Sequence, residues 1–225
     1  MAKGQPRAWC PQRHAWVRDD DDQGSAQEAS SWPQSWIGDH AMKRQPGTPT
    51  YAKAQPSPFR LWSTQDRPIY GAYLRDPSLW LHMPEPPPSR LDDADLDALI
   101  ALSADAPHHH VRAALQEGQP VGQMRLEFIG AHRSKAELSY WLGAPHRGQG
   151  IGRALVTRFV QQALAEFPGL DLIVARVHPQ NTASARLLQG CGFTATTRQI
   201  TGLTARGRDE GDWPVFALSR FGALA

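Results

Sequence analysis

Residues 136–167 read AELSYWLGAPHRGQGIGRALVTRFVQQALAEF and predict a strand, a glycine-rich loop and a long helix, in that order. One face of the helix carries apolar residues at a spacing of four, namely Ile151, Leu155, Phe159, Ala163 and Phe167. That spacing is typical of the buried side of an amphipathic helix. Gly148, Gly150 and Gly152 therefore stand at its N-terminus, where free N–H groups and the helix dipole favour an anion. Arg147 and Arg153 add positive charge, so we expect the loop to bind a diphosphate.

Two common diphosphate-binding motifs do not fit this loop. A P-loop requires a lysine followed by serine or threonine after its last glycine, and no lysine follows any of these glycines. A dinucleotide fingerprint requires Gly-x-Gly-x-x-Gly, whereas this chain has Gly148-Gln149-Gly150-Ile151-Gly152. The missing lysine therefore excludes a P-loop nucleotide hydrolase, and the glycine spacing excludes a dinucleotide-binding enzyme.

The sequence from residue 57 onward alternates between patterns of strands and helices. We expect a short strand near 59–61, a helix that begins after Ser63 or Thr64 and ends before Pro77, and a second helix over 91–103. Residues 109–115 and 121–129 predict the two strands of a hairpin, and 136–142 predict a third strand. A further strand is expected over 171–177, followed by a helix.

The run Arg147-Gly148-Gln149-Gly150-Ile151-Gly152 resembles the pyrophosphate loop of the GNAT superfamily of acetyl-CoA-dependent N-acetyltransferases. Its flanks agree: SYWL at 139–142, DLIVARV at 171–177 and HPQNTASARLLQGCGF at 178–193 resemble the branch that acetylates ribosomal-protein N-termini. The resemblance spans about residues 57–220. It implies a mixed α+β fold, a bent mixed sheet of six or seven strands with about four helices, and acetyl-CoA bound where the two central strands splay apart.

The resemblance also implies roles for particular residues. Main-chain amides of the loop would bind the CoA pyrophosphate, and the splayed strand would pair with the pantetheine arm and polarise the thioester carbonyl, an oxyanion-hole effect. The implied cofactor-binding residues are Tyr140, Trp141, Leu142, Arg147, Gly148, Gly150, Ile151, Gly152, Arg153 and Asn181.

Two further residues match the Asn-x-x-Ser motif of the family. Asn181 would contact the cofactor or cap the helix that follows it. Ser184 would donate a proton to the departing thiolate or only pack in the first helical turn. Many relatives carry a tyrosine as general acid four residues after this serine, but this chain has Leu188 there. The free thiol has a pKa near 8.5, so its departure needs little help at neutral pH.

Glu137 is the candidate general base, because the family often has a carboxylate at the head of the splayed strand. The alternative is an ordinary exposed glutamate of a strand. An α-amine, with a pKa near 8, is about one-tenth neutral at pH 7, whereas a lysine amine costs about 3 kcal/mol more to deprotonate. A weakly equipped site therefore favours α-amine acceptors.

Composition excludes several other classes of protein. The chain of 225 residues has 24 basic and 22 acidic residues, a balance that argues against a nucleic-acid partner. No apolar run approaches the ~20 residues of a membrane span, and we expect neither a secretory signal nor a membrane partner, hence a cytoplasmic protein. Cys10 and Cys191 are too few for a disulfide framework or a structural metal site. His108, His109 and His110 alternate along a strand and cannot all bind one metal, so we expect no metal.

Residues 1–56 differ in composition from the rest of the chain. The segment has no leucine or phenylalanine, is rich in proline and contains the acidic run 19–22, which indicates a disordered extension. Its four tryptophans, Trp9, Trp16, Trp32 and Trp36, leave open either recognition of a partner or an unselected extension with the true start at Met42. Residues 57–225 are the predicted N-acetyltransferase domain.

The sequence thus predicts an enzyme that transfers acetyl directly from acetyl-CoA to a primary amine, most consistently a protein or peptide N-terminal α-amine. Two alternatives remain open, an acetyltransferase of small amines such as aminoglycosides or polyamines, and a non-catalytic CoA-binding regulatory module. The expected partners are acetyl-CoA and the amine acceptor, and the chain would be a monomer or a homodimer.

Overall fold

The computed structural model describes residues 8–10, 15–17, 57–83, 86–130, 132–197 and 213–221. The chain divides into two compact units, Met1–Pro56 and Ser57–Ala225. In the first unit, β1 (Ala8–Cys10) and β2 (Ala15–Val17) form an antiparallel pair. The disorder expected for residues 1–56 stays a prediction for the remainder of that unit, which lies outside the described residues.

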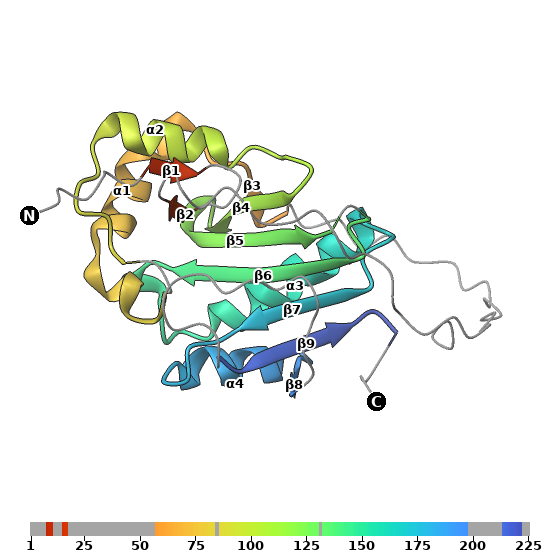
Figure 1. The fold of residues 1–225 in the computed structure, drawn as a ribbon. Coiled ribbons are helices and arrows are strands. Elements are labelled where there is room, and N and C mark those ends of the chain that lie inside the picture. Colours follow the sequence, from red (N-terminus) through yellow and green to blue (C-terminus); the bar gives the residue numbers. More distant parts are fainter. Residues whose placement is uncertain are drawn as a thin grey trace, which may run out of the picture. The chain divides into compact units, whose positions relative to one another are not determined.

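The second unit is built on a seven-stranded mixed sheet in the order β3-β4-β5-β6-β7-β9-β8 (Figure 1). Neighbouring strands are antiparallel except β6 and β7, which are parallel. The strands are β3 (Phe59–Arg60), β4 (His109–Gln116), β5 (Gln119–Ile129), β6 (Lys135–Leu142), β7 (Leu172–Arg176), β8 (Thr194–Thr196) and β9 (Val215–Ser219).

Four α-helices cover the two faces of this sheet (Figure 1). Helices α1 (Arg67–Arg75) and α2 (Asp93–Leu102) lie on one face, and α3 (Ile151–Glu166) and α4 (Thr182–Gly190) on the other. Three short 3-10 helices, η2 (Thr64–Asp66), η3 (Pro77–His82) and η4 (Ala144–His146), connect these elements. Asp92 and Asp95 form a capping box at the start of α2, which satisfies N–H groups that the helix leaves free.

Each face of the sheet has its own apolar core. On the α3/α4 face, Phe159 and Val156 pack against alternate residues of the strands, among them Leu126, Leu138 and Ile173. On the α1/α2 face, four aromatic side chains gather around the end of β6, namely Trp62, Tyr70, Tyr73 and Trp141. Because successive strand residues face opposite sides, neighbouring residues of β6 contribute to different cores.

The central parallel pair opens toward its carboxyl end. Strands β6 and β7 pair over only three positions, the last of which joins Glu137 and Val174. Beyond this point β6 continues to pair with β5 through Leu142, while its other edge is without a strand partner in the described part of the chain. The α+β fold, the seven strands, the four α-helices and the splay therefore confirm the fold expected from the resemblance.

Element bounds follow the sequence-based expectations closely from residue 57 to residue 190. The resemblance implies six or seven strands, but the sequence pattern does not locate the last two, β8 and β9. Strand β8 has only three residues, and β9 follows residues 198–212, which lie outside the described parts. Among the helices that the structure describes, none has the length and apolar character needed to cross a membrane.

The close approach of β5 to β6 requires glycine at position 122. A Cβ atom on Gly122 would overlap the main-chain carbonyl oxygen of Trp141, which is fixed in the sheet. We expect Gly122→Ala to lower the free energy of unfolding by about 1–3 kcal/mol. Gly169→Ala is the matched control, because a Cβ there meets open space. Urea denaturation of both variants checks this, and equal stability would contradict it.

Candidate active site

The glycine loop has the backbone geometry of an anion site. Gly148 and Gly150 adopt left-handed conformations with φ of 72° and 78°, and a Cβ on either would project into open space. Gly150 is the N-cap of α3, which begins at Ile151. The first N–H groups of a helix have no intrahelical partner, so the loop presents free donors beside exposed glycines. This arrangement fits the pyrophosphate that the sequence assigns to it.

Packing of the first turn of α3 fixes the loop against the sheet and α4. Gly152 is buried, and a Cβ there would lie 2.9 Å from Leu187 and 3.4 Å from Leu142. Arg147 donates from Nε to the carbonyl oxygen of Leu142 at 2.8 Å and from Nη1 to the hydroxyl of Ser78 at 2.9 Å. Arg147 therefore ties the loop to the end of β6 and to η3, in addition to supplying charge.

Tyr73, on the α1/α2 face of the sheet, supports the loop through contacts that the sequence analysis did not anticipate. Its hydroxyl donates to the carbonyl oxygen of Pro120 at 3.0 Å and lies 3.1 Å from Nε2 of His146. A hydroxyl has one hydrogen, so His146 must donate to Tyr73 through Nε2. The Tyr73 ring also occupies the space that a Cβ on Gly143 would fill. The sequence signal for its burial is the apolar stripe of Ile69, Tyr73 and Leu74 in the helix expected before Pro77.

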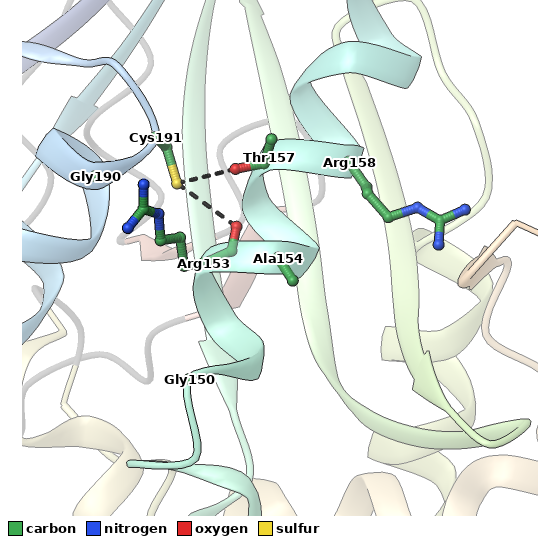
Figure 2. Close-up of a pocket in the computed structure, with 7 residues that line it drawn as sticks. All are labelled: Gly150, Arg153, Ala154, Thr157, Arg158, Gly190 and Cys191. Carbon is green, nitrogen blue, oxygen red and sulfur yellow. Dashed lines mark hydrogen bonds between the residues drawn. The ribbon is translucent and has the colours of Figure 1, made fainter.

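A pocket of about 530 Å³ lies beside the loop, between α3 and the end of α4 (Figure 2). Its lining residues are Gly150, Arg153, Ala154, Thr157, Arg158, Gly190 and Cys191. Figure 2 shows the Arg153 side chain directed toward Gly190, while that of Arg158 points away from Cys191. The free thiol of Cys191 accepts a hydrogen bond from the Thr157 hydroxyl at 3.4 Å. A cationic pocket continuous with the loop fits the remainder of a phosphate-bearing cofactor.

The splayed part of β6 carries three of the predicted cofactor-binding residues. The main chain of Tyr140, Trp141 and Leu142 pairs with β5 on one side and lies beyond the end of the ladder with β7 on the other. The side chain of Trp141 is buried in the α1/α2 core, 6.2 Å from Trp62 between ring centroids. Trp141 therefore anchors this strand, and only its main chain is available to a pantetheine arm.

The side chains of Tyr140 and Ser184 meet across the opening. Their hydroxyl oxygens are 2.8 Å apart, joining β6 to the first turn of α4. Burial raises the pKa of Tyr140 to about 12. Oδ1 of Asn181 accepts a hydrogen bond from the Ser184 amide at 3.1 Å, so the capping role of Asn181 is observed and its contact with the cofactor stays a prediction. Leu188 is completely buried in the α3/α4 core.

Glu137 lies at the apex of the opening, on the α1/α2 face. Arg176 of β7 donates to both of its carboxylate oxygens, at 3.1 and 3.2 Å, and the side chains are only 12% and 8% exposed. Glu137 is therefore not an ordinary exposed strand residue. On the neighbouring strand, directly opposite Glu137, Glu127 forms an ion pair with Arg125. The role of Glu137 as a general base stays a prediction.

Of the three consecutive histidines, His109 and His110 lie on opposite faces of β4. The rings of His108 and His109 pack edge to face with centroids 4.5 Å apart, and a ring nitrogen of His109 lies 2.8 Å from the carbonyl oxygen of Ala104. The centroid of the His110 ring lies 5.8 Å from that of Phe159 on the other face. Within the described ranges, no three histidine, cysteine or carboxylate side chains are grouped so that they could hold a metal ion.

The glycine loop and the splayed strand edge lie at the same end of the central parallel pair, which is the arrangement that the resemblance implies for an acetyl-CoA-dependent acetyltransferase. A sequence profile of the acetyltransferase (GNAT) domain matches residues 58–194, more than half of the chain, and the chain belongs to that family. Its loop, pocket and strand edge fit the CoA that the family uses.

Individual relatives match the chain over different lengths. L-methionine sulfoximine/L-methionine sulfone acetyltransferase of Salmonella typhimurium is 36% identical over 66 residues, which are 29% of this chain and 37% of that protein. The chain thus matches little more than a third of the length of this relative. The curated relative named uncharacterized N-acetyltransferase p20, of Bacillus licheniformis, is 26% identical over 60% of this chain and 77% of its own length.

Among solved structures, spermidine N-acetyltransferase from Vibrio cholerae, in complex with CoA and spermine, aligns with a TM-score of 0.59. The alignment has 17% identity and covers 72% of this chain and 95% of that one. RimL, a ribosomal L7/L12 α-N-protein acetyltransferase in complex with CoA, aligns with a TM-score of 0.59 and 15% identity over 72% of this chain and 92% of its own. These similarities show the shared fold.

We expect Gly150→Glu to abolish detectable binding of acetyl-CoA. The new side chain would occupy the open space above the loop and place a negative charge where we expect the pyrophosphate to bind. Gly118→Glu is the control, because Gly118 has φ of 79° and equal room but lies in the β4–β5 turn. Both variants carry a strain of about 1–2 kcal/mol. Calorimetric titration distinguishes them, and unchanged affinity in Gly150→Glu would contradict the assignment.

Proposed function

We propose that this protein transfers acetyl from acetyl-CoA to an α-amine, with the N-terminus of a protein or peptide as the acceptor. The observation that carries the proposal is that the β6–β7 ladder ends at Glu137 and Val174, and that the glycine loop follows the carboxyl end of the same strand, β6. The strand edge and the loop would hold the thioester and the diphosphate of one acetyl-CoA molecule, with its acyl group at the apex of the opening.

The chemistry of the apex supports an α-amine rather than a lysine side chain. The carboxylate of Glu137 is shared with Arg176, so little free basic capacity stands on the α1/α2 face. An α-amine with a pKa near 8 is about one-tenth neutral at pH 7, and a lysine side chain costs about 3 kcal/mol more to deprotonate. A neutral α-amine can attack directly once it is oriented, and the proton that its nitrogen loses after the attack is the one that Glu137 would accept.

The charges around the apex also argue against polycationic acceptors. Glu127 and Glu137 are each paired with an arginine, and Lys135 lies on the same face of β6 as Glu137. Described carboxylates on this part of the face are thus matched by cations. A polyamine or an aminoglycoside carries several positive charges and is favoured by a surplus of carboxylates.

Some of the similar proteins have names that are consistent with an α-amine acceptor. One relative is named for methionine sulfoximine and methionine sulfone, and RimL for the α-amino group of a ribosomal protein. The spermidine and aminoglycoside acetyltransferases share the fold but act on other amines. A free amino acid is therefore the second candidate, and a small polyamine or aminoglycoside the third.

We expect thiol release from acetyl-CoA with unblocked peptides beginning with alanine or serine. Each peptide contains one lysine and is also supplied with an N-formyl cap, and the panel further contains free amino acids, spermidine and kanamycin. Release with the unblocked peptides and its loss on capping supports the proposal, because only the α-amine differs. Release with spermidine or kanamycin alone contradicts the acceptor class. No release with any amine, although acetyl-CoA binds, indicates a non-catalytic CoA-binding module.

We expect Glu137→Gln to lower kcat by about 10²–10⁴-fold, the range for loss of a general base, without a comparable effect on acetyl-CoA affinity. Glu127→Gln is the matched control, since Glu127 is also paired with an arginine on the same face and stands directly opposite Glu137. Steady-state kinetics with the best acceptor measure both variants. Equal losses in the two would assign Glu137 a structural role only.

A further inference from the structure

The thiolate that leaves in the proposed reaction needs little help at neutral pH, but a hydrogen-bond donor beside it would lower the barrier further, and Leu188 cannot be that donor. When the carbon–sulfur bond breaks, its electron pair stays on sulfur, and a hydrogen-bond donor beside that atom stabilises the thiolate. Leu188 is apolar and completely buried among the residues of the α3/α4 core. The donor must therefore come from another element that reaches the opening between β6 and β7.

Two hydroxyl groups occupy that place, and they are bonded to each other. Tyr140 stands three residues beyond the last β6–β7 pair, and its side chain packs on the α3/α4 face. Ser184 is in the first turn of α4, where the Asn181 cap holds its amide. The distance of 2.8 Å between Tyr140 Oη and Ser184 Oγ makes one hydrogen bond that spans the opening.

We propose that Tyr140 and Ser184 act as one unit that stabilises the departing CoA thiolate by hydrogen bonding, in place of the acid that α4 lacks at Leu188. The inference rests on the proposed function and adds Tyr140 to the machinery. Each hydroxyl has one hydrogen. The contact between the two uses one of these hydrogens, so the pair keeps a second hydrogen for a third acceptor.

The pair donates a hydrogen bond and keeps its protons. Because burial raises the pKa of Tyr140 to about 12, while a free thiol has a pKa near 8.5, a proton would not move from the phenol to the thiolate. The amine loses one proton to the proposed base Glu137, which passes it to solvent, and the thiolate gains one from solvent, so that free CoA and the amide are the products. Tyr140 and Ser184 end the reaction in the state in which they began it.

The test measures the thiol pKa of bound CoA, which needs no acceptor. The ultraviolet absorbance of the thiolate is recorded between about pH 6 and 9.5, below the titration of Tyr140 and across that of a free thiol. The same variant without CoA is subtracted, because Cys191 lies close to Tyr140. A repeat in a Cys191→Ser background removes the titration of that thiol from the measurement.

In the unaltered protein we expect the thiol pKa of bound CoA to lie about one unit below that of free CoA, which corresponds to a tenfold preference for the thiolate. Tyr140→Phe and Ser184→Ala should each return it toward the free value while changing the CoA dissociation constant by less than about threefold. The double variant should be no worse than the stronger single one, because the two hydroxyls act as one unit. Ser184→Thr, which keeps a hydroxyl, should retain the lowered value.

Tyr70→Phe is the control for loss of a buried phenol, because Tyr70 lies on the other face of the sheet, in the α1/α2 core against Trp62. We expect it to leave the thiol pKa unchanged. A thiol pKa that is the same in Tyr140→Phe, Ser184→Ala and the unaltered protein would overturn the inference. Failure of the unaltered protein to bind CoA at all would overturn the proposed function itself, so the two failures are distinguishable.

Discussion

The site depends on one interruption in the backbone hydrogen bonding of the sheet. Parallel strands normally pair along their shared length, but β6 and β7 pair at three positions and then separate after Glu137 and Val174. Buried N–H and C=O groups without partners are costly, so an open strand edge in the middle of a sheet requires a partner. In the proposed complex, the pantetheine arm of acetyl-CoA supplies that partner on the free edge of β6. The same interruption brings the glycine loop and the start of α4 to one end of the sheet.

Two side-chain contacts bridge the opening on opposite faces. The ion pair of Glu137 with Arg176 joins β6 to β7 on the α1/α2 face, and the hydroxyl pair of Tyr140 with Ser184 joins β6 to α4 on the α3/α4 face. The alternation of β6 places these side chains on different faces although they are three residues apart. In the proposed reaction, deprotonation of the amine and stabilisation of the thiolate would therefore take place on separate faces of one strand.

Much of this architecture could be predicted from the sequence because it follows from local patterns. The four-residue spacing on α3 and the glycines before Ile151 indicate their structures directly, and the structure bears out both elements. The pairing of Glu137 with Arg176 could not be predicted, since the two residues lie 39 positions apart and meet only through the β6–β7 register. The sequence assigns Tyr140 a cofactor-binding role through its main chain and gives no role to its hydroxyl. Its contact with Ser184, across 44 positions, depends on the splay, which no local pattern encodes.

The central claim is that one acetyl-CoA molecule fills the strand edge and the glycine loop together. Amide hydrogen exchange measures this directly, because N–H groups that bind the cofactor become protected when it is added. We predict that acetyl-CoA slows exchange both in the splayed end of β6, over residues 138–142, and in the loop, over residues 148–152, with little change in the β4–β5 turn. Protection of the loop alone, or of neither segment, would contradict the account.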